Sequence, residues 1–424
     1  MPTILKNLTL ADGSRSDIRI EGDNIVEMGT ISGSGIDCDS LIGLPGFVDP
    51  HTHLREPGFE ASETVLSGSR AAAAGGYTAV CAMANTLPVA DTAEIVEAVL
   101  DAGVEAGYCQ VQPIGAVTKG LAGKQLSEIT QMHQSRANVT MFSDDGICVS
   151  DSALMQEALA KVKAFGGVIA QHAQDPARTE GAQMNAGPLA IELGLTGWPR
   201  LAEEDIIARD AVLAEQTGSR LHICHLTTAG GVDVVRWAKQ RGIAITAEVT
   251  PHHLLLTEDL VRSYDPVYKV NPPLRTEADT KALIAGVLDG TIDVLGTDHA
   301  PHSAEKKEAE WGHAAFGMLG LETAASILHQ VLADAGSLTW QRFEQLISSR
   351  PAALTGLSDH GQLAVGRKAN ITVFNPHEDL AASSISQSLS SNNPYAGMVF
   401  KGRVQHTVYN GTFTVRDQKL QELK

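Results

Sequence analysis

The chain has 424 residues, which is long enough for one large α/β barrel or for two to three ordinary domains. Its 50 acidic and 32 basic residues give a formal net charge of −18, which argues against nucleic-acid binding and against an anionic membrane surface as partner. No stretch approaches the roughly 20 consecutive apolar residues that cross a bilayer, and the N-terminus lacks a secretory signal, so we expect a cytoplasmic protein.

Both ends of the chain contain short alternating segments separated by turn residues. These segments span residues 4–10 and 16–29 at the N-terminus and 368–376 and 397–415 near the C-terminus. A short N-terminal piece cannot build a core by itself. We therefore predict that residues 1–45 and 360–424 pair into one small β-sandwich domain.

The middle of the chain alternates β-branched or apolar runs with longer Ala-, Leu- and Glu-rich amphipathic segments. This pattern is typical of repeated βα units around a parallel sheet. The eight runs span residues 46–53, 77–85, 107–117, 138–146, 167–175, 219–228, 243–253 and 292–302. Eight strands with intervening helices predict a TIM-type (β/α)8 barrel over residues 46–359, with its reaction centre at the carboxyl ends of the strands.

The connecting segments carry helix start and stop signals. Residues 62–76 begin with Ser-x-Thr and end in Gly-Gly, and residues 91–103 run from an Asp cap to a glycine. Residues 150–167 repeat this format. Each predicted helix ends shortly before the next apolar run, which supports the strand count.

Five of the eight predicted strands end in residues that can bind a metal. These residues are His51, His53, Asp144, Asp145, His172, His225 and Asp298. Any one of them alone is more often a structural residue that satisfies a loop backbone. In a closed barrel, however, all strand ends surround one mouth, so these side chains would converge on a single site.

The residue types indicate which metal this site would bind. Imidazole and carboxylate ligands suit Zn²⁺ or a similar divalent ion, and the five cysteines form no CxxC pair that would indicate a structural site. Four histidines and two carboxylates exceed the needs of one catalytic zinc, so we infer two metals. Either Asp144 or Asp145 could bridge such a pair, at a spacing of roughly 3.5–4 Å, together with a shared hydroxide.

Further polar groups near the strand ends could orient a polar, anionic substrate. They are Arg55, Asn85, Asn271 and His302. Arg55 would offer a bidentate fork to a carboxylate. His302 lies at the start of the long polar segment 301–317. This segment is either a lid over the barrel mouth or a solvent-exposed run of charged residues. His252 and His253 have either a structural role or a supporting role at the site.

Several motifs together resemble one enzyme family. The stretches "GFVDPHTHLREPG", "FSDDG", "HICHLTT", "AEVTPHHL", "YKVNPPLR", "GTDHAPH" and "FGMLGLET" are similar to those of dihydroorotases of the bacterial class I type, in the amidohydrolase superfamily. The resemblance spans nearly the whole chain. It implies the reversible, zinc-dependent interconversion of N-carbamoyl-L-aspartate and L-dihydroorotate in pyrimidine biosynthesis.

The resemblance also implies residue roles. His51, His53 and Asp298 would hold one zinc ion, His172 and His225 the other, and Asp145 would bridge them. Arg55, Asn85 and His302 would contact the α-carboxylate of the substrate, and Asn271 would also bind substrate. Asp298 would carry a proton from the bridging hydroxide to the ring nitrogen.

Two short departures from the family pattern are present. Residues 83–86 read "MANT" where the family often has "MPNT", and residues 172–175 read "HAQD" where it often has "HCED". The first removes a proline before Asn85. The second replaces an acid that could support a metal ligand with Gln174. Neither removes a proposed ligand.

Two alternatives stay open at the level of the sequence. Another cyclic-amide hydrolase, such as a dihydropyrimidinase or an allantoinase, would share the fold and the metals but would not need Arg55 to bind a carboxylate. A catalytically silent subunit that supports aspartate transcarbamoylase would lack ligand histidines, which this chain retains. Family members are often dimers, so we expect a homodimer that could also associate with aspartate transcarbamoylase.

Overall fold

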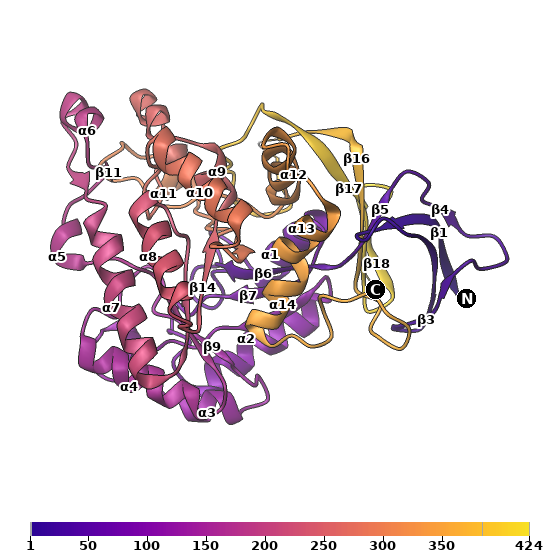
Figure 1. Cartoon of the computed structure of the whole chain (residues 1–424), viewed down its shortest axis with the longest axis horizontal. Helices are drawn as coiled ribbons and strands as arrows, with labels where there is room; N and C mark the ends of the chain where they lie inside the picture. Colours follow the sequence, from indigo (N-terminus) through magenta and orange to yellow (C-terminus); the bar gives the residue numbers. More distant parts are fainter. Residues whose placement is uncertain (1, 384, 424) are drawn as a thin grey trace.

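The computed structural model describes residues 2–383 and 385–423. Figure 1 shows parallel strands covered by helices in one part of the molecule and a twisted sheet built from both ends of the chain in the other. Among the described residues, no helix has the length and apolar character needed to span a membrane.

The parallel strands form two sheets. One contains β6 (Phe47–Thr52), β7 (Tyr77–Ala82) and β8 (Gln110–Pro113). The other contains β9 (Met141–Phe142), β10 (Val168–Gln171), β13 (Arg220–Ile223), β14 (Ile245–Val249) and β15 (Val294–Leu295). Each of the eight predicted runs contains one of these strands, although every strand is shorter than its run. Isolated parallel bridges link the two sheets on both sides, between Gly115 and Phe142 and between Thr52 and His299.

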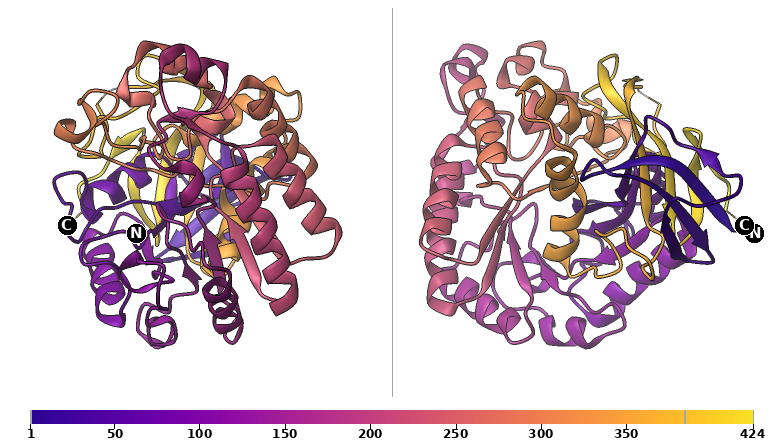
Figure 2. Two further views of the ribbon diagram at one scale, coloured as in Figure 1. Left: turned by 90° about the vertical axis from the view of Figure 1, so that its left-hand side faces the viewer. Right: turned by 45° about the vertical axis from the view of Figure 1, so that its right-hand side comes forward.

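Helices cover the outer side of these strands, as both views in Figure 2 show. The longer ones are α1 (Val65–Ala74), α2 (Ala93–Ala106), α4 (Ser152–Lys163), α7 (Leu201–Thr217), α8 (Ala229–Gln240), α10 (Glu277–Asp289) and α12 (Ala324–Asp334). Shorter helices elsewhere in the chain are α3 (Ile129–Gln134), α5 (Pro176–Thr179), α6 (Pro188–Leu193), α9 (Pro251–Leu255), α11 (Ala304–Lys307), α13 (Trp340–Glu344) and α14 (Arg350–Thr355). A small parallel pair, β11 (Met184–Asn185) and β12 (Gly197–Trp198), lies in the segment between β10 and α7.

Helix α2 shows where the predicted helix boundaries were wrong. The expected Asp91 cap instead accepts a hydrogen bond from the Gly120 backbone N–H at 2.8 Å, and Thr92 is the N-cap. The helix continues past Gly103. A Cβ at this position would lie 2.5 Å from Val111 Cβ, so the glycine allows the helix to pack closely on β8. The helix ends at Gly107, which has a left-handed φ of 73°.

Strands from the two ends of the chain pair with each other. The strands are β1 (Thr3–Leu10), β2 (Arg15–Glu21), β3 (Asn24–Gly29), β4 (Ile36–Asp37), β5 (Ile42–Pro45), β16 (Ile371–Ala381), β17 (Val399–Tyr409), β18 (Thr412–Arg416) and β19 (Lys419–Leu420). They form one nine-stranded sheet, in which β5 pairs antiparallel with β16 and so joins the two ends. In Figure 1 the indigo N-terminal strands lie beside the yellow C-terminal ones.

Strand β5 leads directly into β6, so the sheet is tied to the strand that carries the first two histidines. Gly46 separates the two strands, and a Cβ at this position would overlap the Thr78 side chain on β7. Beyond it, the Phe47 ring packs edge-on against Tyr77 and Phe343 at 5.8 and 5.9 Å. The position of His51 and His53 is therefore fixed by buried packing at the start of β6.

Candidate active site

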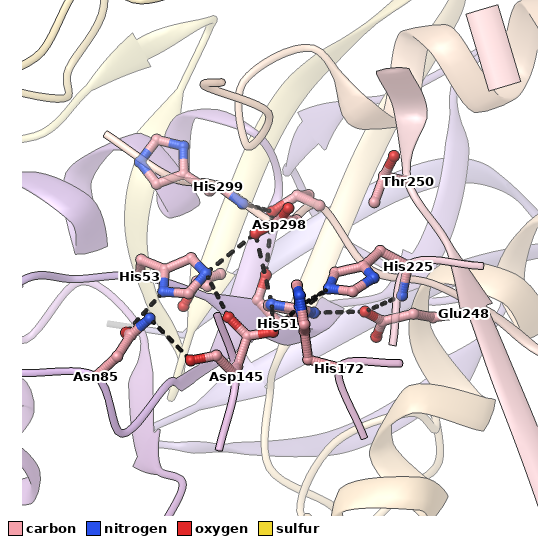
Figure 3. Close-up of polar contacts among 12 residues, drawn as sticks. His51, His53, Asn85, Asp145, His172, His225, Glu248, Thr250, Asp298 and His299 are labelled. Atoms are coloured by element: carbon pink, nitrogen blue, oxygen red, sulfur yellow. Dashed lines mark hydrogen bonds and ion pairs between the residues drawn. The ribbon is translucent and has the colours of Figure 1, made fainter. Parts of the chain in front are cut away.

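The six side chains predicted to bind metal converge at the strand ends. They are His51, His53, Asp145, His172, His225 and Asp298, and each is at most 5% exposed. Figure 3 shows five of them grouped around Asp145, and the six together come from five different strand ends. The structure therefore brings these six side chains together at one end of the parallel strands.

Two groups of these side chains lie close enough to bind a cation, and they share Asp145. The first is His51, His53 and Asp145, and the second is Asp145, His172 and His225. His53 Nε2 lies 3.3 Å from Asp145 Oδ2, whereas His172 Nδ1 and His225 Nε2 lie 3.3 and 3.4 Å from Asp145 Oδ1. His51 Nε2 also lies 3.4 Å from Asp145 Oδ1, so Oδ1 faces histidines of both groups and Oδ2 faces His53.

Asp298 lies against the first group. Its Oδ1 is 3.0 Å from His53 Nε2 and 3.5 Å from His51 Nε2. Asp298 has a φ of 47° and His225 a φ of 30°, a region that non-glycine residues rarely occupy. Such conformations cost about 1–3 kcal/mol and are concentrated at functional sites.

The choice between Asp144 and Asp145 is resolved by their contacts. Asp144 accepts backbone hydrogen bonds from Val117 at 2.7 Å and Thr118 at 3.0 Å, so its carboxylate holds the loop after β8. It also accepts from the Thr118 hydroxyl. Asp145, the next residue, points toward the histidines, and only this aspartate is available as a shared ligand.

The cluster contains buried polar atoms that the protein itself does not satisfy. His51 Nε2 and Asp145 Oδ1 lie 3.4 Å apart, and neither has a hydrogen-bond partner among the described residues. Burial lowers the pKa of His51, but the carboxylates of Glu248, Asp145 and Asp298 outweigh it and raise that pKa well above its usual value. The site therefore stabilises positive charge at this position, as a divalent cation site would.

A side-chain acceptor fixes each of three histidines. Asn85 Oδ1 lies 2.9 Å from His53 Nδ1, and Gln174 Oε1 lies 2.7 Å from His172 Nε2. Glu248 Oε1 lies 2.5 Å from His51 Nδ1. Such partners orient a metal-binding histidine and set its tautomer.

Glu248 was missed by the sequence analysis. It lies within β14 and is 0% exposed, and besides His51 it also contacts the backbone N–H of His225 at 3.0 Å. The available signal was a single acidic residue inside the apolar run "IAITAEV". A buried carboxylate requires compensating partners, so such a residue points to a polar centre.

The residues predicted to bind substrate lie around this cluster. Arg55 Nε donates to Pro301 O at 3.1 Å, and Arg55 Nη2 lies 3.4 Å from His302 Nε2. Burial lowers the pKa of Arg55 to about 10, so it remains cationic at neutral pH. Burial and the Arg55 charge together lower the pKa of His302 to about 3, so this imidazole remains neutral. Asn271 Nδ2 donates to Gln174 Oε1 at 3.3 Å.

The remaining histidines near the strand ends have separate positions. His222 contacts Thr246 Oγ1 at 2.9 Å and Glu248 Oε2 at 3.1 Å. His299 lies apart from the cluster in Figure 3 and contacts Glu63 at 3.3 Å. His253 lies in α9 and not in a strand, and it contacts the Pro272 carbonyl at 3.1 Å.

A third group, His51, Cys224 and Glu248, is also compact enough for one cation. It shares His51 with the first group. Burial raises the pKa of the Cys224 thiol, so the sulfur stays protonated and is a poor ligand. The two groups that share Asp145 are therefore the better cation sites.

Comparison with known proteins gives a consistent family. Residues 40–230 match the family model described as "Dihydro-orotase-like". Dihydroorotases of Streptomyces coelicolor and Leifsonia xyli are 54% and 56% identical to the chain, covering 99% and 98% of it and 99% and 96% of the relatives. Dihydroorotase of Mycobacterium tuberculosis is 46% identical, covering 96% of this chain and 97% of its own.

Solved structures of cyclic-amide hydrolases share the fold. L-hydantoinase (dihydropyrimidinase) from Arthrobacter aurescens matches with a TM-score of 0.88 and 25% identity, covering 99% of this chain and 97% of its own. D-hydantoinase (dihydropyrimidinase) from Thermus sp. matches with a TM-score of 0.83 and 26% identity, covering 100% and 97%. The much higher identity to the dihydroorotases decides between these families, and the chain belongs to the dihydroorotase family.

Proposed function

We propose that the protein is a dihydroorotase that reversibly opens the ring amide of L-dihydroorotate to give N-carbamoyl-L-aspartate in pyrimidine biosynthesis. The observation that carries this proposal is the pair of histidine groups that share Asp145 in a chain of this family. The full ligand set argues against a silent subunit.

The donor set fits two divalent cations. His51, His53 and Asp298 would hold one, His172 and His225 would hold the other, and Asp145 would be shared. Imidazole and carboxylate without thiolate suit zinc. When bound, two zinc ions would acidify the attacking water and polarise the amide carbonyl.

Asp298 would transfer the proton. Its Oδ1 lies 3.0 Å from His53 Nε2, beside both histidines of the first group. We expect the carboxylate to accept a proton from the attacking water and to deliver it to the ring nitrogen as the carbon–nitrogen bond breaks. In the reverse direction, the same carboxylate removes the nitrogen proton while the ring closes.

Arg55 would bind the substrate α-carboxylate, together with Asn85 and the neutral His302. An acidic chain needs such a local cation to attract an anion, and Arg55 stays charged at neutral pH. Asn271 Oδ1 has no hydrogen-bond partner among the described residues, so it could accept a hydrogen bond from an N–H of the cyclic amide.

We also propose that the eight parallel strands close into one (β/α)8 barrel over residues 46–359. The bridges between Gly115 and Phe142 and between Thr52 and His299 support closure on both sides. Residues 1–45 and 360–424 would then form a separate β-sandwich domain, supported by the pairing of β5 with β16. A cytoplasmic location and a homodimer, with or without aspartate transcarbamoylase, are further proposals.

Metal content and turnover, measured on the same purified chain, test the proposed function. We expect two zinc ions per chain and turnover of dihydroorotate that far exceeds turnover of dihydrouracil and allantoin. Preference for either of the other substrates would instead assign the chain to the dihydropyrimidinase or allantoinase activity. A chain that binds no metal and turns over none of the three substrates would contradict the proposed dihydroorotase activity and also the two alternative activities.

A further inference from the structure

Gln174 lies between a proposed metal ligand and a proposed substrate residue. Its Oε1 is 2.7 Å from His172 Nε2 and accepts a hydrogen bond from Asn271 Nδ2 at 3.3 Å. His172 directly follows β10, whereas Asn271 lies in the segment between α9 and α10. One carbonyl oxygen thus contacts two distant parts of the chain at the site.

Thr179 fixes the orientation of this amide. Gln174 Nε2 donates to Thr179 Oγ1 at 2.8 Å, and the buried Thr179 hydroxyl donates to the Asp175 carbonyl at 3.0 Å. Because the hydroxyl proton is used by Asp175, Thr179 Oγ1 can only accept from the amide. The nitrogen of Gln174 must therefore face Thr179, and its oxygen must face His172.

This orientation determines the tautomer of His172. Gln174 Oε1 can only accept, so His172 must carry its proton on Nε2. The lone pair of Nδ1 then points to the other side of the ring, where Nδ1 lies 3.3 Å from Asp145 Oδ1 and 2.8 Å from His225 Nε2. This is the arrangement that a metal-binding imidazole requires.

We propose that Gln174 is a positioning residue that fixes His172 for cation binding and Asn271 for substrate binding through one amide. The inference rests on the function proposed above. With Asn271 Nδ2 held by Gln174, the unpartnered Asn271 Oδ1 is the atom left to contact substrate. Loss of Gln174 should therefore affect both cation affinity and the KM for dihydroorotate.

The side chain at position 174 is a neutral amide, although glutamate has nearly the same shape and would add a negative charge. A carboxylate at position 174 would still accept from His172, and more strongly than an amide does. It would add a negative charge beside the group that binds an anionic substrate. We therefore expect Gln174→Glu to retain or tighten zinc binding while raising the KM for dihydroorotate.

The test compares zinc affinity of the metal-stripped, full-length protein, measured by competition with a chelator, with the KM for dihydroorotate. We expect Gln174→Leu to weaken zinc binding about 10- to 100-fold, the effect typical of losing such a ligand partner, and to raise the KM. Thr179→Val, which frees the amide to rotate, should give a smaller loss of the same kind. Gln183→Leu is the matched control, because the Gln183 Oε1 has no hydrogen-bond partner among the described residues, and it should change neither quantity.

The outcomes separate this inference from the proposed function. Wild-type zinc affinity and KM in Gln174→Leu would overturn the role of Gln174. The role would also be overturned if Gln174→Glu binds zinc as weakly as Gln174→Leu does. If the wild-type chain binds zinc but does not open dihydroorotate, the proposed substrate is wrong. A zinc loss in Gln174→Leu that Gln183→Leu does not share would still support the positioning role. A wild-type chain that binds no zinc would overturn both.

Discussion

Asp298 has the position of a proton carrier, since it contacts both histidines of the first cation group and occupies a strained backbone conformation. We expect Asp298→Asn to keep much of its bound metal, because the amide oxygen can still face His53. The amide cannot accept the proton, so turnover should fall by at least about 10²–10⁴-fold, the usual contribution of a general base. Measuring kcat and metal content on the same preparation checks both expectations.

The same substitution at Asp289 serves as the control for Asp298→Asn. Asp289 ends α10 and pairs with Arg236 at 2.8 Å, well separated in its contacts from the site residues. Asp289→Asn should leave turnover unchanged. Near-normal turnover in Asp298→Asn would remove Asp298 as the proton carrier.

Arg55 should affect substrate binding more than chemistry. Hydrogen bonds to charged groups contribute about 1.5–3 kcal/mol, so Arg55→Met should raise the KM for dihydroorotate roughly 10- to 100-fold. Arg70→Met is the control, since Arg70 pairs with Glu422 at 2.8 Å on another surface. Unchanged steady-state kinetics in Arg55→Met would show that the anion site lies elsewhere.

At the scale of elements, two buried lysines fix the segment 301–317 through hydrogen bonds to backbone carbonyls. Lys307 on α11 donates to the Lys269 and Ala315 carbonyls at 2.8 and 2.9 Å, and Lys269 donates to the Trp311 carbonyl at 2.5 Å. Lys269 Nζ also lies 4.5 Å from the centroid of the Phe316 ring. These contacts fix the segment that carries His302.

The lysines make stability depend on pH. Burial and the nearby Lys269 charge lower the pKa of Lys307 from 10.5 to about 7, although the Asp265 carboxylate acts in the opposite direction. Burial also lowers the pKa of Lys269 from 10.5 to about 8. Between these values and 10.5 the unfolded chain binds more protons, so the free energy of unfolding should rise with pH in this window. Urea unfolding at pH 7 and pH 9.5 should show a smaller rise in Lys307→Met than in the wild type.

The exposed neighbour Lys306 provides the control for this pH effect. Lys306→Met should keep the wild-type rise between pH 7 and pH 9.5. If Lys307→Met keeps that rise as well, the buried lysine does not titrate in the window.

Element boundaries also show what the sequence could and could not predict. The eight strands and the candidate ligands followed from periodicity and from residues at strand ends, whereas only the family resemblance favoured Asp145 over Asp144. The end of α2 did not follow in this way, because whether Gly103 stops a helix or packs against Val111 depends on a neighbour in the fold. Glu248 was not assigned because its role consists of contacts to residues far away along the chain. For Gln174 the sequence indicated only a position that could support a metal ligand, and its contact with the distant Asn271 required the fold.

At the scale of the whole molecule, the nine-stranded sheet is joined to the helices by an aromatic cluster. Phe374 on β16 is 0% exposed, and its ring lies 5.6 Å from Phe343 and 5.9 Å from Trp340. Strand β16 pairs with β5, which continues into the strand that carries His51 and His53. The pairing of the chain ends thus supports the candidate site from outside it.

Phe374→Ala should therefore destabilise the whole molecule without changing the site chemistry. Deleting a buried phenylalanine side chain costs about 3–5 kcal/mol, which urea unfolding followed by circular dichroism would measure. Phe413→Ala is the matched control, because Phe413 on β18 is only partly buried and contacts His406 at a centroid distance of 5.7 Å. It should cost clearly less, and folded protein of both variants should bind as much zinc as the wild type. Equal losses in the two variants would mean that the aromatic cluster does not join the sheet to the helices.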